Sequence, residues 1–399
     1  MQRLFAFIDH APRHMENDLS RPELLKVPLQ RIAVFRALML GDMLCVIPAI
    51  RALRHAFPQA EITLVGLPWA AEIVTRFPMY FDRFLAFPGF PGMPEREPDV
   101  KEFPQFFLQA QQERFDLALQ LHGSGRFTNS IVMLMGGRAT AGFYEQDGYR
   151  PNSEWFFPYP TELHEVHRNL HLAELLGIPA CGEALEFPVT AEDEDSYCAL
   201  PVAEQLGNEP FVCIHPGARS ANRRWPQEYF AHLADGLANH GYHIVITGSV
   251  EEIGLANAVQ AAMTAKAINL AGQTSLGTLA ALLRRCALLV CNDTGVSHVA
   301  AALRAPSVIL VTCSDPARWA PLDRQLHRVV TEPAACRPRQ QKTSAIGLPS
   351  ASRITVERVM AEAMAALGAA GHQSGSEQTK ASADVERIPS LVPGTKGRS

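Results

Sequence analysis

Three segments of this 399-residue chain place chemically capable side chains directly after an apolar run that is typical of a buried strand. The first segment, with the sequence RALMLGD, ends in Gly41 and Asp42. Glycine permits a sharp turn at low steric cost, and a carboxylate at the start of the following helix is kept ionised by the helix dipole. Asp42 is therefore a candidate general base for a hydroxyl group. A simple helix cap is an equally good interpretation of this segment alone.

The second segment has the sequence HPGARSANRRWP and begins at His215. Gly217 would let backbone amides approach an anion, and Arg223 belongs to a group of three arginines in the same loop. Arginine binds phosphate oxygens through paired hydrogen bonds. Arginines clustered just past a strand end favour a phosphate site over a solvated basic loop.

The third segment, NDTGVSH, joins another apolar run to a predicted helix. The amides of Thr294 and Gly295 would open that helix, and a helix N-terminus binds anions. His298 lies about one turn further on and can face the same ligand. Helix capping by Asp293 or Thr294, with His298 packed against the sheet, would explain the same pattern.

Two weaker candidates are a carboxylate and a basic helix face. Glu252 follows a further strand end and could accept hydrogen bonds from ribose hydroxyls, although a solvent-facing glutamate in a first helical turn is at least as good an interpretation. Arg51 and Arg54 could meet acceptor phosphates or anionic lipid, or simply form a solvated face. The candidates for acceptor or loop contacts are Gly41, Arg51, Arg54, His215 and Gly217.

These segments need elements that bring them to one cleft. From residue 31 onward, apolar runs alternate with helical patterns, as in parallel α/β sheets. The alternation stops between Phe187 and Pro210, where we place a linker, and resumes until Thr312. Ligands of doubly wound sheets bind at the carboxyl ends of strands, so two such sheets predict a cleft between them. The acidic run at 193–195 lies in the linker and is interpreted as a solvated charge run.

Composition narrows the class of protein. With 47% hydrophobic and 19% charged residues the chain is globular, and its net charge of -5 argues against a nucleic-acid partner. The eight cysteines include no CxxC pair, so we expect no zinc site and reduced thiols in a cytoplasmic protein. No signal peptide or membrane-spanning run is evident, so any membrane contact would be peripheral.

In this order, the three segments resemble the lipopolysaccharide heptosyltransferases of glycosyltransferase family 9, over about residues 31–331. The matching stretches are RALMLGDMLCVIPAIRALRHAFP, HPGARSANRRWPQEYFAHL and CNDTGVSHVAAAL. The resemblance implies the α/β fold called GT-B, with two Rossmann-like doubly wound parallel-sheet domains facing a cleft. It also implies inverting transfer without an essential metal or other cofactor, from ADP-heptose to a lipid-linked or polysaccharide acceptor, typically the lipopolysaccharide core. Such an enzyme would be cytoplasmic, with peripheral contact at the inner membrane.

The resemblance implies roles for single residues as well. Asp42 falls on the catalytic base, and Glu252 falls where a carboxylate can hold the ribose. The positions on the donor diphosphate site are Arg223, Asp293, Thr294, Gly295 and His298. Leu38 stands where relatives have a small polar residue, and Arg223 replaces a lysine with a different geometry, which leaves the sugar and the acceptor open.

The expected division of the chain has five parts. They are an N-terminal extension (1–28), an acceptor-binding domain (29–190), a nucleotide-sugar-binding domain (205–333), a segment with a helix (334–368) and a disordered tail (369–399). Two other functions stay open: a nucleotide-sugar epimerase of the same fold, which needs no acceptor, and a nucleotide-binding partner protein without catalysis.

Overall fold

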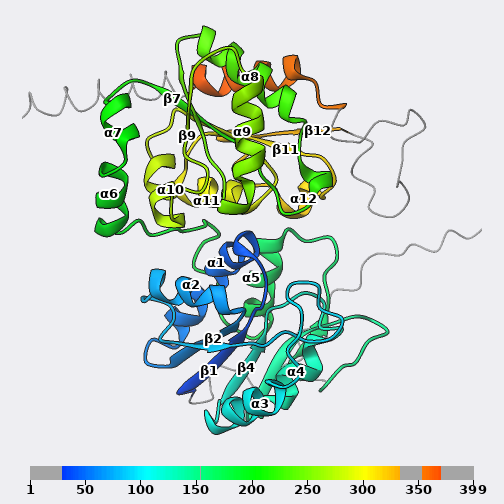
Figure 1. Ribbon diagram of the computed structural model, residues 1–399. Helices are drawn as coiled ribbons and strands as arrows, with labels where there is room; N and C mark the ends of the chain where they lie inside the picture. Colours follow the sequence, from blue (N-terminus) through cyan, green and yellow to red (C-terminus); the bar gives the residue numbers. More distant parts are fainter. Residues whose placement is uncertain (1–28, 153, 333–352, 370–399) are drawn as a thin grey trace, which may run out of the picture.

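The structure, a computed structural model, describes residues 29–152, 154–332 and 353–369 (Figure 1). It contains two parallel six-stranded sheets with flanking helices, which confirms the predicted α/β fold class. We call the part built on β1–β6 the N-terminal half and the part built on β7–β12 the C-terminal half. The predicted N-terminal extension and nearly all of the predicted tail lie outside the described residues.

The strands are short and mostly buried, because helices cover both faces of each parallel sheet. The first sheet is formed by β1 (Arg31–Phe35), β2 (Glu61–Gly66), β3 (Arg83–Ala86), β4 (Leu117–Gln120), β5 (Ala139–Tyr144) and β6 (Phe156–Pro158). The second sheet is formed by β7 (Phe211–His215), β8 (His243–Ile246), β9 (Ala267–Asn269), β10 (Leu288–Asn292), β11 (Ser307–Val311) and β12 (His327–Thr331).

Both sheets have the same strand order. The first runs β3-β2-β1-β4-β5-β6, and the second runs β12-β11-β10-β7-β8-β9, which is the same order read from the other edge. The direction in which each sheet grows reverses between β1 and β4 and between β7 and β10. Ligands bind outside the carboxyl ends of the strands at such switch points. The fold therefore marks one binding crevice in each half.

The helices pack on both sheets and meet between them (Figure 1). In the N-terminal half they are α1 (Leu40–Ala56), α2 (Ala71–Arg76), α3 (Phe103–Gln112), α4 (Thr128–Leu134) and α5 (Glu165–Leu175), with the 3-10 turn η2 (Pro68–Ala70). Beyond it lie α6 (Ala191–Cys198), α7 (Pro201–Leu206), η3 (Ala221–Arg223), α8 (Gln227–Asn239), η4 (Val250–Glu252), α9 (Ile253–Ala262), α10 (Leu276–Leu283), α11 (Gly295–Leu303) and α12 (Pro316–Trp319).

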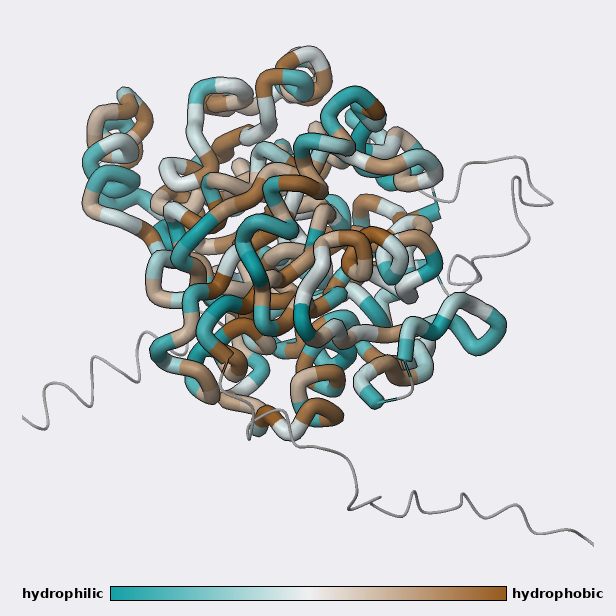
Figure 2. The backbone as a smooth tube through the Cα atoms, turned by 90° about the horizontal axis from the view of Figure 1, so that it is seen from below, coloured by the Kyte–Doolittle hydropathy of each residue, from teal (hydrophilic) through white to brown (hydrophobic). Residues whose placement is uncertain are grey.

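One apolar core runs through both halves. Buried residues of α1, α5, α10 and α11 belong to a single cluster, and α1 contacts both α5 and α11. Figure 2 shows hydrophobic segments gathered in the interior, with polar stretches in many of the outer turns. The two halves are thus joined by packing as well as by the chain.

The sequence prediction missed several strands and ended the second sheet at β11. The structure adds β12, in which buried and half-buried residues are mixed, and which lies at the edge of its sheet. It also adds β3, β5 and β6 in the N-terminal half. β3, β6 and β12 are edge strands, which carry weaker hydrophobic patterns because they are less completely covered, whereas β5 is a largely buried inner strand that the sequence prediction also missed.

The predicted linker is not irregular, because it forms α6 and α7. Thr190 and Asp193 cap α6 reciprocally, with the Thr190 amide 2.9 Å from Asp193 Oδ2 and the Asp193 amide 3.2 Å from Thr190 Oγ1. Asp193 is buried and pairs with Arg76 of α2 at 2.6 Å. The interpretation of this acidic run as solvated is therefore wrong for Asp193, although it holds for the exposed Asp195.

The predicted C-terminal helix is present over residues 356–369 and packs against the C-terminal half. The indole of Trp225 donates a hydrogen bond to the carbonyl of Ile354, 2.8 Å away, just before this helix. The seven cysteines in the described part of the chain are free. Within those same residues, no helix combines the length and apolar character needed to cross a bilayer.

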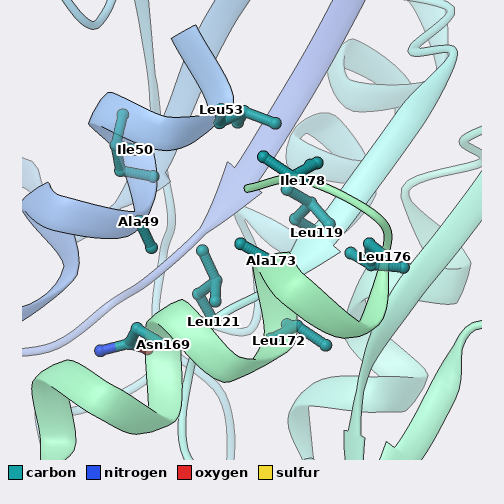
Figure 3. A pocket seen from close by; sticks show the side chains of 10 residues that line it. All are labelled: Ala49, Ile50, Leu53, Leu119, Leu121, Asn169, Leu172, Ala173, Leu176 and Ile178. Atoms are coloured by element: carbon teal, nitrogen blue, oxygen red, sulfur yellow. The ribbon is translucent and has the colours of Figure 1, made fainter. Parts of the chain in front are cut away.

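A small cavity lies between α1, α5 and the first sheet (Figure 3). Its volume of about 10 Å³ has room for one water molecule at most. The lining is apolar except for Asn169, whose amide nitrogen already donates to the carbonyls of Cys45 and Glu165 at 3.2 and 2.8 Å. This cavity is a packing gap behind α1 and not a substrate pocket.

The role of Asp193 leads to a stability test. We expect Asp193→Asn to lower the free energy of unfolding by about 1–2 kcal/mol, because it removes the charged partner of Arg76 and weakens the helix cap. Urea denaturation of this variant is compared with that of Asp195→Asn, which changes an exposed residue of the same helix. Equal stabilities for the two variants would contradict the assignment.

Candidate active site

Asp42 lies in the first turn of α1, close to the carboxyl end of β1 and the first switch point, as predicted. It does not act as the N-cap, because Met39 occupies that position. Burial raises the pKa of Asp42, while the charges of Arg36 and His298 act in the opposite direction. The expectation that the helix dipole controls this carboxylate is thus incomplete, since burial has the larger effect. A raised pKa makes the ionised carboxylate a stronger base.

The C-terminal half reaches this point through α11. The ring of His298 packs on Gly41 so closely that a Cβ atom there would lie 2.5 Å from His298 Cδ2. Gly41 does not have a positive φ, so glycine is needed for this approach and not for the sharp turn predicted from the sequence. His298 Nδ1 also lies 3.6 Å from Cys45 Sγ. The ring is therefore packed between the halves.

The N-terminus of α11 faces the N-terminus of α1. Thr294 is the N-cap of α11 in an extended conformation, and a Cβ atom on Gly295 would lie 3.2 Å from Leu40 of α1. The first amides of a helix have no partner within it, and the helix dipole makes this end positive. Two positive helix ends thus converge where an anionic ligand would lie.

Asp293 and Arg223 meet beside this helix end. The Asp293 carboxylate is buried, accepts a hydrogen bond from the Ser314 hydroxyl and lies 4.0 Å from Arg223 Nη1. The side chain of Arg223 remains 43% exposed, so it is free to meet a ligand. A carboxylate repels phosphate, and the geometry therefore suits Asp293 to orienting Arg223 better than to contacting a diphosphate directly.

Asn292 holds the two predicted donor segments together. Its amide donates to the Pro216 carbonyl at 2.8 Å and accepts from the Trp225 amide at 3.0 Å. These bonds fasten the arginine-rich loop to the carboxyl end of β10, at the second switch point. The structure thus brings Arg223 and the N-terminus of α11 together at the carboxyl ends of the central strands of the second sheet.

Glu252, His215 and Gly217 form a neighbouring group. Glu252 Oε2 accepts from the Ser249 amide at 2.9 Å and lies 3.7 Å from His215 Nε2. Gly217 leaves the space that the Glu252 carboxylate occupies. Burial lowers the pKa of His215, and the charge of Glu252 opposes that shift. Glu252 is therefore a largely buried capping residue and not solvent-facing, while its contact with a ribose remains a prediction.

Arg51 and Arg54 have structural roles. Arg51 donates to the carbonyls of Cys181 and Gly182 at 3.0 and 2.9 Å and pairs with Glu186. Arg54 binds several backbone carbonyls and Asp82. Both lie roughly 14–18 Å along α1 from Asp42, at 1.5 Å per residue. Their proposed acceptor contacts are therefore not supported, because both side chains are already bonded to carbonyl and carboxylate groups of the N-terminal half.

A buried charge network behind Asp42 was not foreseen. Arg36 is fully buried, its Nε donates to the Asp42 carbonyl at 2.9 Å, and its Nη2 pairs with Glu165 at 3.2 Å. Burial by itself would raise the pKa of Glu165, but the charges of the three surrounding arginines outweigh it and hold the pKa below its usual range. Arg36 is a positioning residue for the segment that carries Asp42.

The same glutamate contacts the C-terminal half. Arg318 of α12 pairs with Glu165 Oε2 at 3.1 Å and donates to the Tyr159 hydroxyl at 3.1 Å. Beside it, His164 Nε2 lies 2.9 Å from the Ala320 carbonyl. The start of α5 therefore bonds both the segment of Asp42 and the facing half.

Two Rossmann-like halves, with Asp42 of one beside the N-terminus of α11 of the other, form an architecture of the kind found in two-domain transferases. The model of the family described as glycosyltransferase family 9 (heptosyltransferase) matches residues 105–348, more than half of the chain. The protein belongs to this family and is a glycosyltransferase.

Similar proteins of known sequence agree with this assignment. The chain is 28% identical over 314 residues to lipopolysaccharide heptosyltransferase 2 of Escherichia coli K12, covering 74% of this chain and 86% of that protein. It is 26% identical over 305 residues to lipooligosaccharide heptosyltransferase 2 of Haemophilus ducreyi, covering 71% and 84%. Neither the epimerase nor the inactive-partner alternative is favoured by these relatives.

Solved structures share the fold. A family 9 glycosyltransferase from Veillonella parvula superposes with a TM-score of 0.71 at 23% identity, covering 86% of this chain and 98% of that one. The ADP-heptose lipopolysaccharide heptosyltransferase II of Escherichia coli has a TM-score of 0.65 at 24% identity, covering 85% and 98%.

The buried pair of Arg36 and Glu165 can be tested by its effect on stability. We expect Glu165→Gln to destabilise the protein by roughly 3–5 kcal/mol near neutral pH, because it leaves a buried arginine without its counter-charge. Because the native pKa of Glu165 is lowered, its contribution to stability is full at pH values above its unfolded pKa of about 4.3. That contribution is lost as the pH falls from this value through the lower native pKa.

Urea denaturation at several pH values measures this difference. The matched control is Glu162→Gln, which changes an exposed residue three positions earlier. A loss of stability that is small, or equal in both variants, would show that the buried pair does not hold this region.

Proposed function

We propose that the protein transfers heptose from ADP-heptose to the lipopolysaccharide core or a related glycan, in the cytoplasm or at the cytoplasmic face of the inner membrane. Family membership and the named activities of its relatives support this choice of substrates. The observation that carries the mechanism is the packing of His298 on Gly41. This contact supports the proposal because it brings the segment of Asp42 close to α11 of the other half.

The donor is held by the C-terminal half in this proposal. Arg223 and the leading amides of α11, at Thr294 and Gly295, bind the diphosphate, and Asp293 orients Arg223. Glu252 lies at the neighbouring strand end for the ribose. Negative charge grows on the leaving diphosphate during transfer, and preorganised cations and amides stabilise it. His298 lies between Asp42 and Asp293, where it keeps the two halves in contact.

The acceptor hydroxyl is activated from the N-terminal half. Asp42 takes the hydroxyl proton while the hydroxyl oxygen bonds to the anomeric carbon and the bond from that carbon to the diphosphate oxygen breaks. A single displacement of this kind inverts the anomeric configuration. We propose that the reaction needs no bound metal, because the cationic and amide groups meet the charge of the diphosphate.

The assignment of Asp42 predicts a loss of turnover without a loss of donor binding. We expect Asp42→Asn to lower kcat by about 100-fold or more, the usual contribution of a general base, while the Kd for ADP stays the same. In the wild type, activity should fall as the pH drops through the raised pKa of Asp42, because protonation removes the base.

Steady-state kinetics with pH variation and calorimetry with ADP measure both quantities. Asp147→Asn, which alters an exposed aspartate, is the control. An Asp42→Asn enzyme that turned over normally but bound ADP weakly would reverse the assignment.

The assignment of Arg223 makes the opposite prediction. We expect Arg223→Ala to weaken ADP binding roughly 10- to 100-fold, the range for a lost charge-assisted hydrogen bond, and Arg223→Lys to recover part of it. Calorimetry in the presence of EDTA measures the Kd for ADP, and the EDTA removes free divalent metal ions so that the binding measured is metal-independent.

Arg138→Ala is the matched control, because Arg138 is exposed and precedes the amino end of β5, away from the crevices. Unchanged ADP affinity in Arg223→Ala would remove this arginine from the donor site.

A further inference from the structure

A loop of the N-terminal half brings a second carboxylate to the boundary between the two halves. Glu95 lies between β3 and α3, and Arg219 of the facing half donates to the carbonyls of Pro94 and Glu95, each 3.4 Å away. Burial raises the pKa of Glu95, and the negative charge of Asp42 raises it further. Glu95 therefore lies between the two halves, close enough to Asp42 to sense its charge.

One oxygen of the Glu95 carboxylate has no hydrogen-bond partner in the described part of the chain. This oxygen, Oε2, is buried. The other oxygen, Oε1, lies 4.0 Å from His122 Nε2, which is too far for a direct hydrogen bond. A buried polar oxygen without a partner is unfavourable and rare in folded proteins, so this one needs a donor from elsewhere.

His122 presents a defined donor opposite this carboxylate. Its Nδ1 accepts a hydrogen bond from the Ala37 amide at 3.2 Å, so the proton of the neutral ring is on Nε2. Burial lowers the pKa of His122 to about 3, and the ring is neutral at physiological pH. Ala37 follows β1 and His122 follows β4, so this hydrogen bond spans the first switch point.

We propose that Glu95 and His122 form a subsite for a hydroxyl group of the acceptor sugar. The Nε2–H of His122 donates to the hydroxyl oxygen, and the hydroxyl donates to Glu95. A hydroxyl oxygen beside the pair can lie about 2.8 Å from His122 Nε2 and donate to the Glu95 carboxylate, whose oxygen without a partner is Oε2. This subsite rests on the proposed function, and it adds a selectivity for the acceptor to that function.

The chemistry of the pair selects a neutral group at this point. A phosphate or carboxylate on the acceptor would be repelled by Glu95, and the neutral ring of His122 offers no positive charge to offset that repulsion. The subsite therefore accepts an unphosphorylated hydroxyl beside the one that Asp42 activates. An acceptor phosphorylated at that position would be a poor substrate.

The test compares Glu95→Gln with Glu97→Gln, a neighbouring exposed glutamate in the same loop. Heptose-deficient lipopolysaccharide is the acceptor, and ADP-heptose is present at saturation. We expect Glu95→Gln to lower kcat/KM for the acceptor roughly 10- to 100-fold, the effect of losing a hydrogen bond to a charged group, while the Kd for ADP changes less than twofold. The Glu97→Gln enzyme should behave like the wild type.

A second variant and a second substrate series separate binding from structure. His122→Asn keeps an acceptor for the Ala37 amide but removes the Nε2 donor, and it should also raise the acceptor KM. In a set of monodeoxy acceptors, the loss of one hydroxyl should slow the wild type by the same factor and slow Glu95→Gln little further.

The outcomes are distinguishable. If the wild type moves no heptose to this acceptor, the proposed function fails and the subsite falls with it. If the wild type is active but Glu95→Gln has an unchanged kcat/KM for the acceptor, only the subsite is overturned. An equal loss of acceptor and ADP affinity in Glu95→Gln would also overturn it, because the residue would then support the cleft as a whole.

Discussion

The buried ion pair of Arg36 and Glu165 is the interaction on which the active-site geometry depends. Arg36 bonds the backbone of Asp42, and Glu165 reaches Arg318 in the other half, so one pair of charges fixes both the base and the facing surface. Removing two charges from water is expensive, and only a nearly complete set of partners offsets it. Each partner is therefore constrained, and we expect a change at any of them to displace the segment that carries Asp42.

The acidic groups of the site come from one half of the protein, and the cationic groups come from the other. Asp42 and Glu95 face the cleft from the N-terminal half, whereas Arg223 and the start of α11 face it from the C-terminal half. Acidic groups bind and deprotonate neutral hydroxyls, and cations with helix amides bind phosphates. Such a division would hold a glycan acceptor and a diphosphate donor in opposite orientations without a specific contact between the two substrates.

The sequence was sufficient to predict what depends on local patterns. Strand ends followed by Gly-Asp or Asp-Thr-Gly located Asp42 and the N-terminus of α11, because the strands of a doubly wound sheet lead into helices at the side where ligands bind. It could not reveal the partner of Arg36, since Glu165 is 129 residues away and nothing local relates them. It also could not show that Arg51 and Arg54 bond carbonyl groups of their own half, because a basic helix face looks the same whether water or carbonyl groups surround it.

Helix α6 is attached to both halves at one side of the molecule. Asp193 pairs with Arg76 of α2, which lies below α6, while Glu194 pairs at 2.7 Å with Arg285, just after the neighbouring α10, and α12 lies on the opposite side (Figure 1). The α12 side is fastened as well, by the pair of Arg318 with Glu165 and by the contact of His164 with the Ala320 carbonyl. The two halves are therefore held at both sides, and any separation that pivots about one side would have to break the polar contacts at the other.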